Sequence, residues 1–469
     1  MFNSTLWLTL ATLAGLAAGF AREWLLVSSW GAGSRSDAFL VALFLPEALR
    51  MTMAGGLLAA AALPLYGQRD ESARRHWLNG LSPWLLLCSL LLSGVFAIGA
   101  PLWVHLIGPG LDEAARSQAI DNLYLLAACV PGFVLHAQFS IPLQARERFV
   151  LAGLGSLMFN LPAVIYLGVQ NADSQPQHLA LACLLGSLLM PLSLLIPVWR
   201  LGWRPYSRDA DLRAGRELLR KLGPLLGSNL ASQGLALLER MIASMLGEGA
   251  VTWINLARKL INLPLIALMN LNQVLLSMMS GRQGAARLGM LRQGLAAATV
   301  FSVPASLGLV GAAPTLVALL LPEHVNSEPL VLLLAWFAVP LVFGAWNALL
   351  ARYAYAAGDT GLPLRCELWG SLVSALLLVS LPFVVGLYGV ALATLAGGVT
   401  TGLLLMQRQG LLSTLGWAKQ WLLSLGLLGL VALALYPLDG GVLQLGLSTL
   451  LCTLVLVGFA LWLKPWRVH

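Results

Sequence analysis

Charged residues are scarce in this 469-residue chain, in which Asp, Glu, Lys and Arg together make up 10% of the residues. A water-soluble domain carries about 25% charged residues, so the composition excludes a soluble globular protein. Hydrophobic residues make up 58% of the chain, and the mean hydropathy is +0.81. A transmembrane helix needs about 20 apolar residues. The apolar content therefore exceeds what one or two membrane anchors require and predicts a polytopic membrane protein.

Cysteine is scarce as well, and the motifs of most catalytic classes are missing. The five cysteines are odd in number and lie in apolar runs, which excludes a disulfide framework and a closely spaced metal-binding motif. The sequence has no nucleotide-binding phosphate loop, no His-Glu-x-x-His motif and no Gly-x-Ser-x-Gly motif. We therefore predict no metal and no cofactor, and we do not expect an enzyme.

Fourteen apolar stretches are long enough to cross a membrane, and short charged or Gly/Pro-rich breaks separate them. The breaks are too short to hold a folded domain outside the membrane. In the first stretch, Gly15 and Gly19 form a GxxxG motif, which predicts a close contact with a neighbouring helix. The stretches begin near Leu6, Asp37, Leu78, Gln118, Phe149, Gln177, Gly215, Ala250, Gln293, Glu328, Pro363, Leu387, Trp417 and Val442.

The distribution of Lys and Arg over the loops predicts the orientation in the membrane. With the N-terminus in the cytoplasm, 20 basic residues lie in cytoplasmic loops and two, Arg35 and Arg116, lie on the opposite side. This asymmetry follows the positive-inside rule, so we expect both termini in the cytoplasm. The net charge of +8 is spread over many short loops and forms no continuous footprint for nucleic acid.

A basic segment divides the predicted spans into two lobes. Residues 200–221 contain seven basic residues and follow the sixth span. We expect an all-α membrane protein with an N-terminal lobe over 1–200, a cytoplasmic linker over 201–221, a second lobe over 222–410 and two additional helices over 411–469.

Six basic residues lie inside the predicted spans, where a cation costs about 2.5 to 3.5 kcal/mol on insertion scales. Such residues form ion pairs, snorkel to the interface or face a water-filled cavity. Excess positive charge in a cavity indicates an anionic substrate, because phosphate groups bind desolvated cations through charge-assisted hydrogen bonds. The six are Arg22, Arg50, Arg240, Arg258, Lys259 and Arg352.

Acidic neighbours offer partners to some of these cations. Glu23 and Asp37 are candidate partners of Arg22. Arg258 and Lys259, by contrast, have no acidic residue in their own span, so they are stronger candidates for ligand binding. The remaining expectations are pairing of Arg50 with Glu47, pairing of Arg240 with Glu239, and snorkelling of Arg352.

Several stretches resemble one known family. Residues 19–26 (GFAREWLL), 31–39 (GAGSRSDAF) and 45–50 (LPEALR) resemble the N-terminal signature of the MviN/MurJ family. Residues 239–264 and 357–363 (AGDTGLP) are similar to later parts of the same family. This family belongs to the multidrug/oligosaccharidyl-lipid/polysaccharide exporter superfamily.

The resemblance implies a lipid flippase of the bacterial inner membrane. It implies two six-helix lobes around a central cationic cavity, with two further helices that form a groove for a lipid tail. The implied substrates are undecaprenyl-pyrophosphate-linked sugars, typically the peptidoglycan precursor lipid II. Arg22, Asp37 and Arg50 match functional positions of the family motif, and Lys259, with Arg258 beside it, falls at a cavity arginine.

Four departures from the family pattern concern the head group. Lipid II flippases typically have Arg where this chain has Leu16 and Met51, and an acidic residue at Gly55 and Asn262. These departures favour a relative that flips the lipid-linked repeat unit of an exopolysaccharide, with lipid II as the alternative. A cation-coupled drug exporter and a membrane enzyme, such as a glycan polymerase, are the other candidates.

The sequence thus leads to one mechanism of alternating access. The pyrophosphate of the polyprenyl-linked glycan is bound by four basic side chains, and an ion gradient or the membrane potential drives transport. Membrane lipids and the machinery of polysaccharide or cell-wall synthesis are the expected partners. The pyrophosphate-binding residues are Arg22, Arg50, Arg258 and Lys259, and the supporting or gating residues are Glu23, Asp37, Glu239, Arg240 and Arg352.

Overall fold

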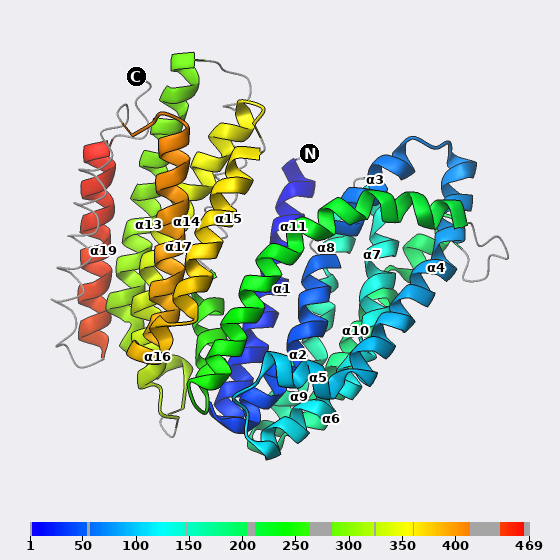
Figure 1. Ribbon diagram of the computed structural model, residues 1–469, viewed down its shortest axis with the longest axis horizontal. Helices are drawn as coiled ribbons and strands as arrows, with labels where there is room; N and C mark the ends of the chain where they lie inside the picture. The colour runs from blue at the N-terminus through cyan, green and yellow to red at the C-terminus, as the bar shows by residue number, and fades with distance from the viewer. Residues whose placement is uncertain are drawn as a thin grey trace. The chain divides into compact units, whose positions relative to one another are not determined.

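The computed structural model describes residues 2–53, 57–146, 148–203, 212–262, 284–322, 325–359, 361–412 and 441–463. These residues form helices joined by short turns and contain no strand (Figure 1). Ten of the described helical segments are long and apolar enough to cross a membrane. The prediction of an all-α polytopic membrane protein is therefore confirmed.

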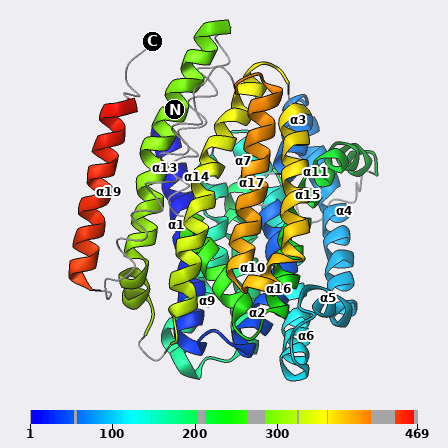
Figure 2. The ribbon, with the colours of Figure 1, turned by 60° about the vertical axis from the view of Figure 1, so that its left-hand side comes forward.

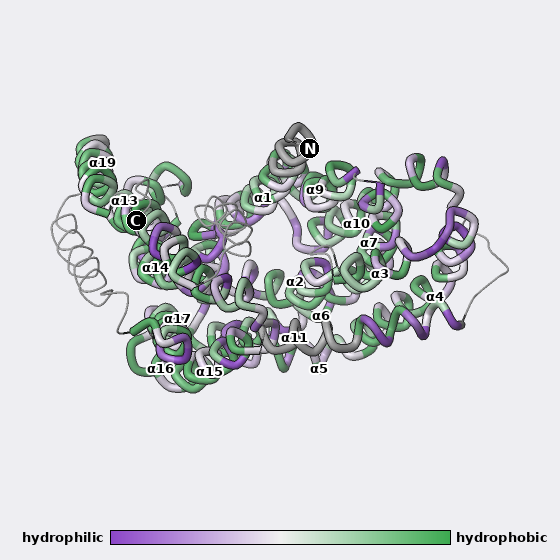
Figure 3. The backbone as a smooth tube through the Cα atoms, turned by 90° about the horizontal axis from the view of Figure 1, so that it is seen from above, coloured by the Kyte–Doolittle hydropathy of each residue, from purple (hydrophilic) through white to green (hydrophobic). Residues whose placement is uncertain are grey.

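The count of fourteen spans stays a prediction. The span expected from Trp417 lies outside the described residues, and the span expected from Ala250 is described only as far as Asn262. Where the helices are described, hydrophobic residues dominate and hydrophilic stretches are short (Figure 3).

The chain divides into two compact units, Met1–Thr252 and Trp253–His469. The division expected from the sequence, with an N-terminal lobe over 1–200 and a linker over 201–221, stays a prediction. Part of that linker, residues 204–211, lies outside the described residues. The helix that follows the linker packs with the first unit, and this packing places the division after it.

The first unit consists of long helices and several short ones. The long helix that follows the linker, α11, packs against α3, α4 and α5. The helices are α1 (Phe2–Trp30), α2 (Ser34–Thr52), α3 (Leu58–Gly67), α4 (Glu71–Ile98), α5 (Ala100–Ile107), α6 (Glu113–Ala127), α7 (Val130–Gln144), α8 (Phe149–Gly153), α9 (Gly155–Gln170), a 3₁₀ turn (Asn171–Asp173), α10 (Pro176–Arg200) and α11 (Leu212–Met245).

Close helix contacts in the first unit depend on small residues. A Cβ atom added to Gly186 of α10 would overlap the backbone carbonyl of Phe159 in α9. A Cβ atom added to Gly132 of α7 would likewise overlap the Ser187 carbonyl of α10. Apolar side chains exert little driving force for association in lipid, so such close backbone contacts carry much of the packing between helices. They fix α9 and α10, and α9 carries part of the site described below.

A buried hydrogen-bond network in this unit joins Gln138, Ser82 and Trp203. Gln138 donates from Nε2 to the Ser82 hydroxyl over 2.6 Å and to the Leu78 carbonyl over 3.1 Å. The indole N–H of Trp203 donates to the same Ser82 hydroxyl over 2.9 Å. Since an unpaired polar group in hydrocarbon costs several kcal/mol, these bonds fix the positions of α4, α7 and the turn after α10 relative to one another.

The second unit has its core between α13 and α14. Trp346 of α14 is fully buried and donates from its indole N–H to the Thr299 hydroxyl of α13 over 2.9 Å. On either side, α13 packs against α19 and α14 packs against α17, which in turn packs against α15 (Figure 2). The helices are α13 (Gly284–Leu320), α14 (Glu328–Ala356), α15 (Gly361–Leu378), α16 (Leu381–Val385), α17 (Tyr388–Arg408) and α19 (Val442–Leu463).

Candidate functional site

The contact between α1 and α9 creates the environment of the first predicted site residue. A Cβ atom on Gly15 would lie 2.8 Å from Ser156 Cβ, and one on Gly19 would lie 3.5 Å from Asn160 Nδ2. The GxxxG motif therefore makes the close contact predicted from the sequence. At Gly19 an added Cβ atom would make an ordinary van der Waals contact with Asn160, so Gly15 is the position where the close approach of α9 requires glycine.

Arg22 is fully buried at this contact and its guanidinium group is extensively bonded. Nη1 donates to Asn160 Oδ1 over 2.9 Å, and Nη2 donates to Glu23 Oε1 over 2.6 Å and to Glu47 Oε2 over 2.9 Å. The Phe159 ring lies 5.7 Å from its Cζ. Buried charges in membranes are paired in this manner because an isolated ion is too costly. Arg22 is thus a structural centre that joins α1, α2 and α9.

Arg50, near the end of α2, shares a carboxylate with Arg22. Its Nη2 contacts Glu47 Oε1 at 3.3 Å, while the other oxygen of Glu47 accepts from Arg22. Arg50 Nη1 lies 3.4 Å from the Ser156 hydroxyl, and its Cζ lies 4.8 Å from the centre of the Phe159 ring. The contacts of Arg50 are longer than those of Arg22, and Arg50 retains 4% of its surface exposed.

The formal charges of the cluster formed by Arg22, Glu23, Glu47 and Arg50 sum to zero. The cluster contains the two positive groups of Arg22 and Arg50 and the two negative groups of Glu23 and Glu47. Glu47 is the most accessible of these side chains, with 23% of its surface exposed. The sequence predicted pairing of these arginines with acidic neighbours as the alternative to cavity-facing cations, and the structure shows that pairing.

Two members of the site are absent from the sequence prediction. Asn160 and Phe159 lie on α9, far from the motif that contains Arg22, and become its neighbours only when α9 packs on α1. The available signal was an Asn inside an otherwise apolar span, because a polar side chain in hydrocarbon needs a partner.

Asp37, at the start of α2, caps another helix. It is 2% exposed. Oδ2 accepts from the backbone N–H of Gly249 over 2.8 Å, and Oδ1 accepts from the N–H of Thr252 over 2.8 Å and from its hydroxyl over 2.5 Å. Gly249 has φ of +80°, and a Cβ atom there would lie 2.8 Å from the Ala32 carbonyl. Asp37 therefore satisfies the free N–H groups at the start of the helix over 250–262.

Of the two residues of α11 expected to support the site, Arg240 binds the backbone of α2. Arg240 donates from Nη1 to the Leu40 carbonyl over 2.6 Å, and its Cζ lies 5.0 Å from the Phe44 ring. Glu239 precedes it and is half-buried. Arg240 thus fastens the end of α11 to α2. Its acceptor, Leu40, lies on α2 one turn after Asp37.

The predicted cations of the second unit lie on the helix over 250–262. Arg258 donates from Nη2 to the Thr394 hydroxyl of α17 over 3.2 Å, and its Cζ lies 4.9 Å from the Phe337 ring of α14. Lys259 follows it and is half-buried, as is Arg352 near the end of α14. Convergence of these cations with those of the first unit on one pyrophosphate stays a prediction.

The later family stretch forms a turn and a helix cap. Gly358 has φ of +86°, a left-handed conformation that favours glycine. Asp359 Oδ1 accepts from the N–H groups of Gly361 over 3.0 Å and Leu362 over 2.9 Å, which caps α15. This stretch therefore has a structural role at the junction of α14 and α15.

Comparison with known proteins identifies the family of this chain. A model of the protein family described as "Lipid II flippase MurJ" matches residues 26–463. The chain belongs to the MurJ family. It is 26% identical over 398 residues to a probable lipid II flippase MurJ of Thermotoga maritima, covering 84% of this chain and 82% of the relative. A probable MurJ of Aquifex aeolicus is 23% identical over 386 residues, covering 80% and 76%.

Solved structures agree on the MurJ fold. A structure described as "Lipid II flippase MurJ, inward closed conformation" superposes with a TM-score of 0.85 at 19% identity, covering 99% of both chains. An inward-facing multidrug resistance MATE family transporter of the MOP superfamily superposes with a TM-score of 0.68 at 15% identity, covering 87% of this chain and 99% of the other. The chain is thus a multi-pass membrane protein of a bacterial inner-membrane flippase family, which is a transporter family and not an enzyme family.

Proposed function

We propose that this protein is a lipid II flippase that moves its substrate from the cytoplasmic to the periplasmic leaflet by alternating access. The match to the MurJ family over residues 26–463 carries the proposal, because it includes both units. The curated relatives of Thermotoga maritima and Aquifex aeolicus are each named as a probable lipid II flippase. These findings favour lipid II over the exopolysaccharide repeat unit that the sequence departures favoured.

Of the residues at the four positions that depart from the family pattern, Met51 contacts the cluster of Arg22, Glu23, Glu47 and Arg50. Leu16 and Met51 are 38% and 55% exposed, and the Sδ atom of Met51 lies 3.6 Å from Arg50 Nη2. Asn262 is exposed at the end of its described helix, and Gly55 lies outside the described residues. The main contacts of Arg22 and Arg50 come instead from α1, α2 and α9.

Within the first unit we assign different roles to the two arginines. Arg22 is fully buried and has three short hydrogen bonds, so its role is to position Glu47 and α9. Arg50 has longer contacts and shares the most exposed carboxylate of the cluster. A pyrophosphate offers more acceptor oxygens than one carboxylate, so it can replace Glu47 at Arg50 through charge-assisted hydrogen bonds.

In the second unit Arg258 and Lys259 are the proposed pyrophosphate-binding residues. Asp37 supports the transport cycle by capping the helix that carries Arg258 and Lys259, and Arg240 supports it by fastening α11 to α2. We assign Glu239 and Arg352 to gating. Cytoplasmic termini, drive by an ion gradient or the membrane potential, and cooperation with the cell-wall synthesis machinery belong to the same proposal.

Transport in proteoliposomes tests this proposal. Lipid II with a fluorophore on its sugar is added, and the fraction reached by an external quencher gives the flipping rate. Replacing Arg50 with Ala removes charge-assisted bonds of about 1.5 to 3 kcal/mol, so we expect the rate to fall about 10- to 150-fold. Arg50→Lys retains the charge and most of the rate. Arg200→Gln, an exposed loop change, is the matched control and leaves the rate unchanged.

The same assay separates the candidate substrates. A lipid-linked exopolysaccharide repeat unit with the same fluorophore is compared with lipid II. Flipping of the repeat unit alone would contradict the lipid II proposal and support the interpretation from the sequence departures. Flipping of neither substrate would contradict both.

A further inference from the structure

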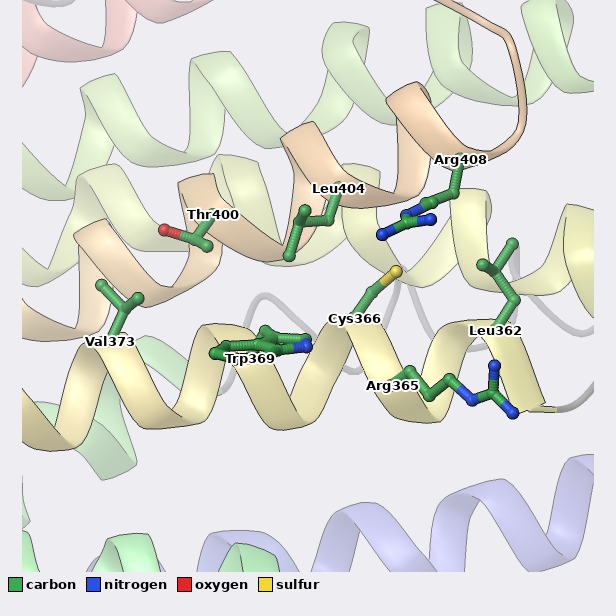
Figure 4. A pocket seen from close by; sticks show the side chains of 8 residues that line it. All are labelled: Leu362, Arg365, Cys366, Trp369, Val373, Thr400, Leu404 and Arg408. Atoms are coloured by element: carbon green, nitrogen blue, oxygen red, sulfur yellow. The ribbon is translucent and has the colours of Figure 1, made fainter.

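A groove between α15 and α17 lies outside the arginine cluster and has no role in the proposed transport. The two helices meet closely at Gly370, where an added Cβ atom would overlap the Thr401 hydroxyl and lie 2.7 Å from the Gly397 carbonyl. Alongside this contact the helices enclose a cavity of about 470 Å³ (Figure 4). This volume lies within the range of about 300 to 1,000 Å³ typical of small-molecule sites.

The groove follows one face of each helix. On α15 its lining extends from Leu362 through Trp369 to Val373, and on α17 it extends from Thr400 through Leu404 to Arg408. Eleven helical residues from Leu362 to Val373 rise about 16 Å. That length is about half of the roughly 30 Å hydrocarbon core, so the groove has the depth of one leaflet.

Positive charge gathers at one end of the groove. Arg365 near the start of α15 and Arg408 at the end of α17 both line it and are both exposed (Figure 4). The lining includes no Asp or Glu, and Glu367 of α15 is not part of it. Within the described part of the chain, neither arginine forms an ion pair. This end of the groove therefore has two cationic groups available to an anion.

The rest of the lining is mostly apolar: Trp369 is exposed, Cys366 is buried, and Leu362, Val373, Thr400 and Leu404 are half-buried. Trp369 is 60% exposed and lies one turn from Arg365. Leu368, Leu372 and Leu376 continue an exposed stripe along α15 at 47%, 47% and 64%. An exposed apolar stripe on a membrane helix is typical of a lipid-facing surface, and Trp beside Arg is typical of the interface.

We propose that this groove binds an anionic diacyl phospholipid. Its head-group phosphate lies at the end of the groove that Arg365 and Arg408 line, and one acyl chain follows the groove past Trp369 towards Val373. The phosphate satisfies two guanidinium groups that have no acidic partner in the lining, and the chain fills a groove of leaflet depth. A free anion explains only the arginine end, whereas a zwitterionic phospholipid brings a phosphate together with a cationic group that the two arginines repel.

Fluorescence quenching by brominated lipids tests the site. The full chain is reconstituted in phosphatidylcholine vesicles that contain phosphatidylglycerol or phosphatidylcholine with brominated acyl chains. The contribution of Trp369 is the difference between the natural chain and Trp369→Phe. For each brominated lipid we measure the mole fraction that quenches half of the Trp369 contribution. We expect this mole fraction to be about thirtyfold lower for phosphatidylglycerol than for phosphatidylcholine, because each of the two arginines contributes about 1 kcal/mol to binding an anionic head group.

The variants separate the site from general surface charge. R365Q/R408Q is expected to lose the preference, and R365K/R408K is expected to keep most of it because a lysine still attracts a phosphate. R200Q/R220Q removes two exposed arginines elsewhere and keeps the full preference. Equal quenching by both lipids, or a preference that survives in R365Q/R408Q, would overturn the proposal. Reversal of quenching by millimolar inorganic phosphate as readily as by unbrominated phosphatidylglycerol would instead assign the site to a free anion.

Discussion

Removal of the buried helix cap at Asp37 is expected to destabilise the first unit. Asp37→Ala leaves the N–H groups of Gly249 and Thr252 without their acceptor, and each unsatisfied buried donor costs about 1 to 3 kcal/mol. Removing the buried carboxylate also removes its desolvation penalty, so the total cost for the two donors falls towards the lower end of its range. We expect the free energy of unfolding to fall by about 3 kcal/mol. For a unit of this size each kcal/mol lowers the apparent Tm by about 2 °C, so the Tm falls by about 6 °C.

A second Asp cap provides the control for this prediction. Asp359 caps α15 with two similar bonds, but it is exposed, so water replaces it and Asp359→Ala costs about 1 kcal/mol. Thermal unfolding of both purified variants in detergent, followed by loss of the monodisperse peak on size-exclusion chromatography, gives the two shifts. Equal shifts, or a larger one for Asp359→Ala, would show that burial does not determine the strength of these caps and would refute the reasoning.

Two further substitutions test packing and surface charge. Gly186→Ala forces a Cβ atom into the Phe159 carbonyl and is expected to cost about 1 to 3 kcal/mol, whereas Gly168→Ala on α9, where the space is open, leaves the Tm unchanged. A similar Tm for both would contradict the close contact of α9 and α10. Arg69→Gln removes a 2.6 Å ion pair with the exposed Glu217, and the same assay should show a loss below about 1 kcal/mol; a loss above that would mean that the pair is not screened by solvent.

The fold class could be predicted from composition because a membrane span requires a long apolar run. The runs also located the first-unit helices, and the GxxxG motif at Gly15 and Gly19 predicted a contact that α1 makes with α9. The point at which the first compact unit ends was harder to predict from the sequence. A basic linker indicates where the chain leaves the membrane, whereas the packing of α11 against α3, α4 and α5 depends on side chains distant in sequence.

The candidate site could be predicted only in part. Sequence proximity identified Glu23 as a partner of Arg22, and both lie in the same cluster. Asp37 was the other candidate, but it caps a helix formed by residues more than 200 positions later. Asn160 and Phe159 reach Arg22 only through the packing of α9, and no local pattern identifies that neighbour.

The balanced cluster around Arg22 has an electrical consequence. Moving one elementary charge through the membrane field releases about 2.3 kcal/mol per 100 mV. A rigid displacement of Arg22, Glu23, Glu47 and Arg50 carries equal positive and negative charge, so its gating charge is zero and voltage performs no net work on it. Under the proposed function, the phosphates of a bound lipid would add net negative charge at this cluster, so the empty and loaded forms would respond differently to the same potential.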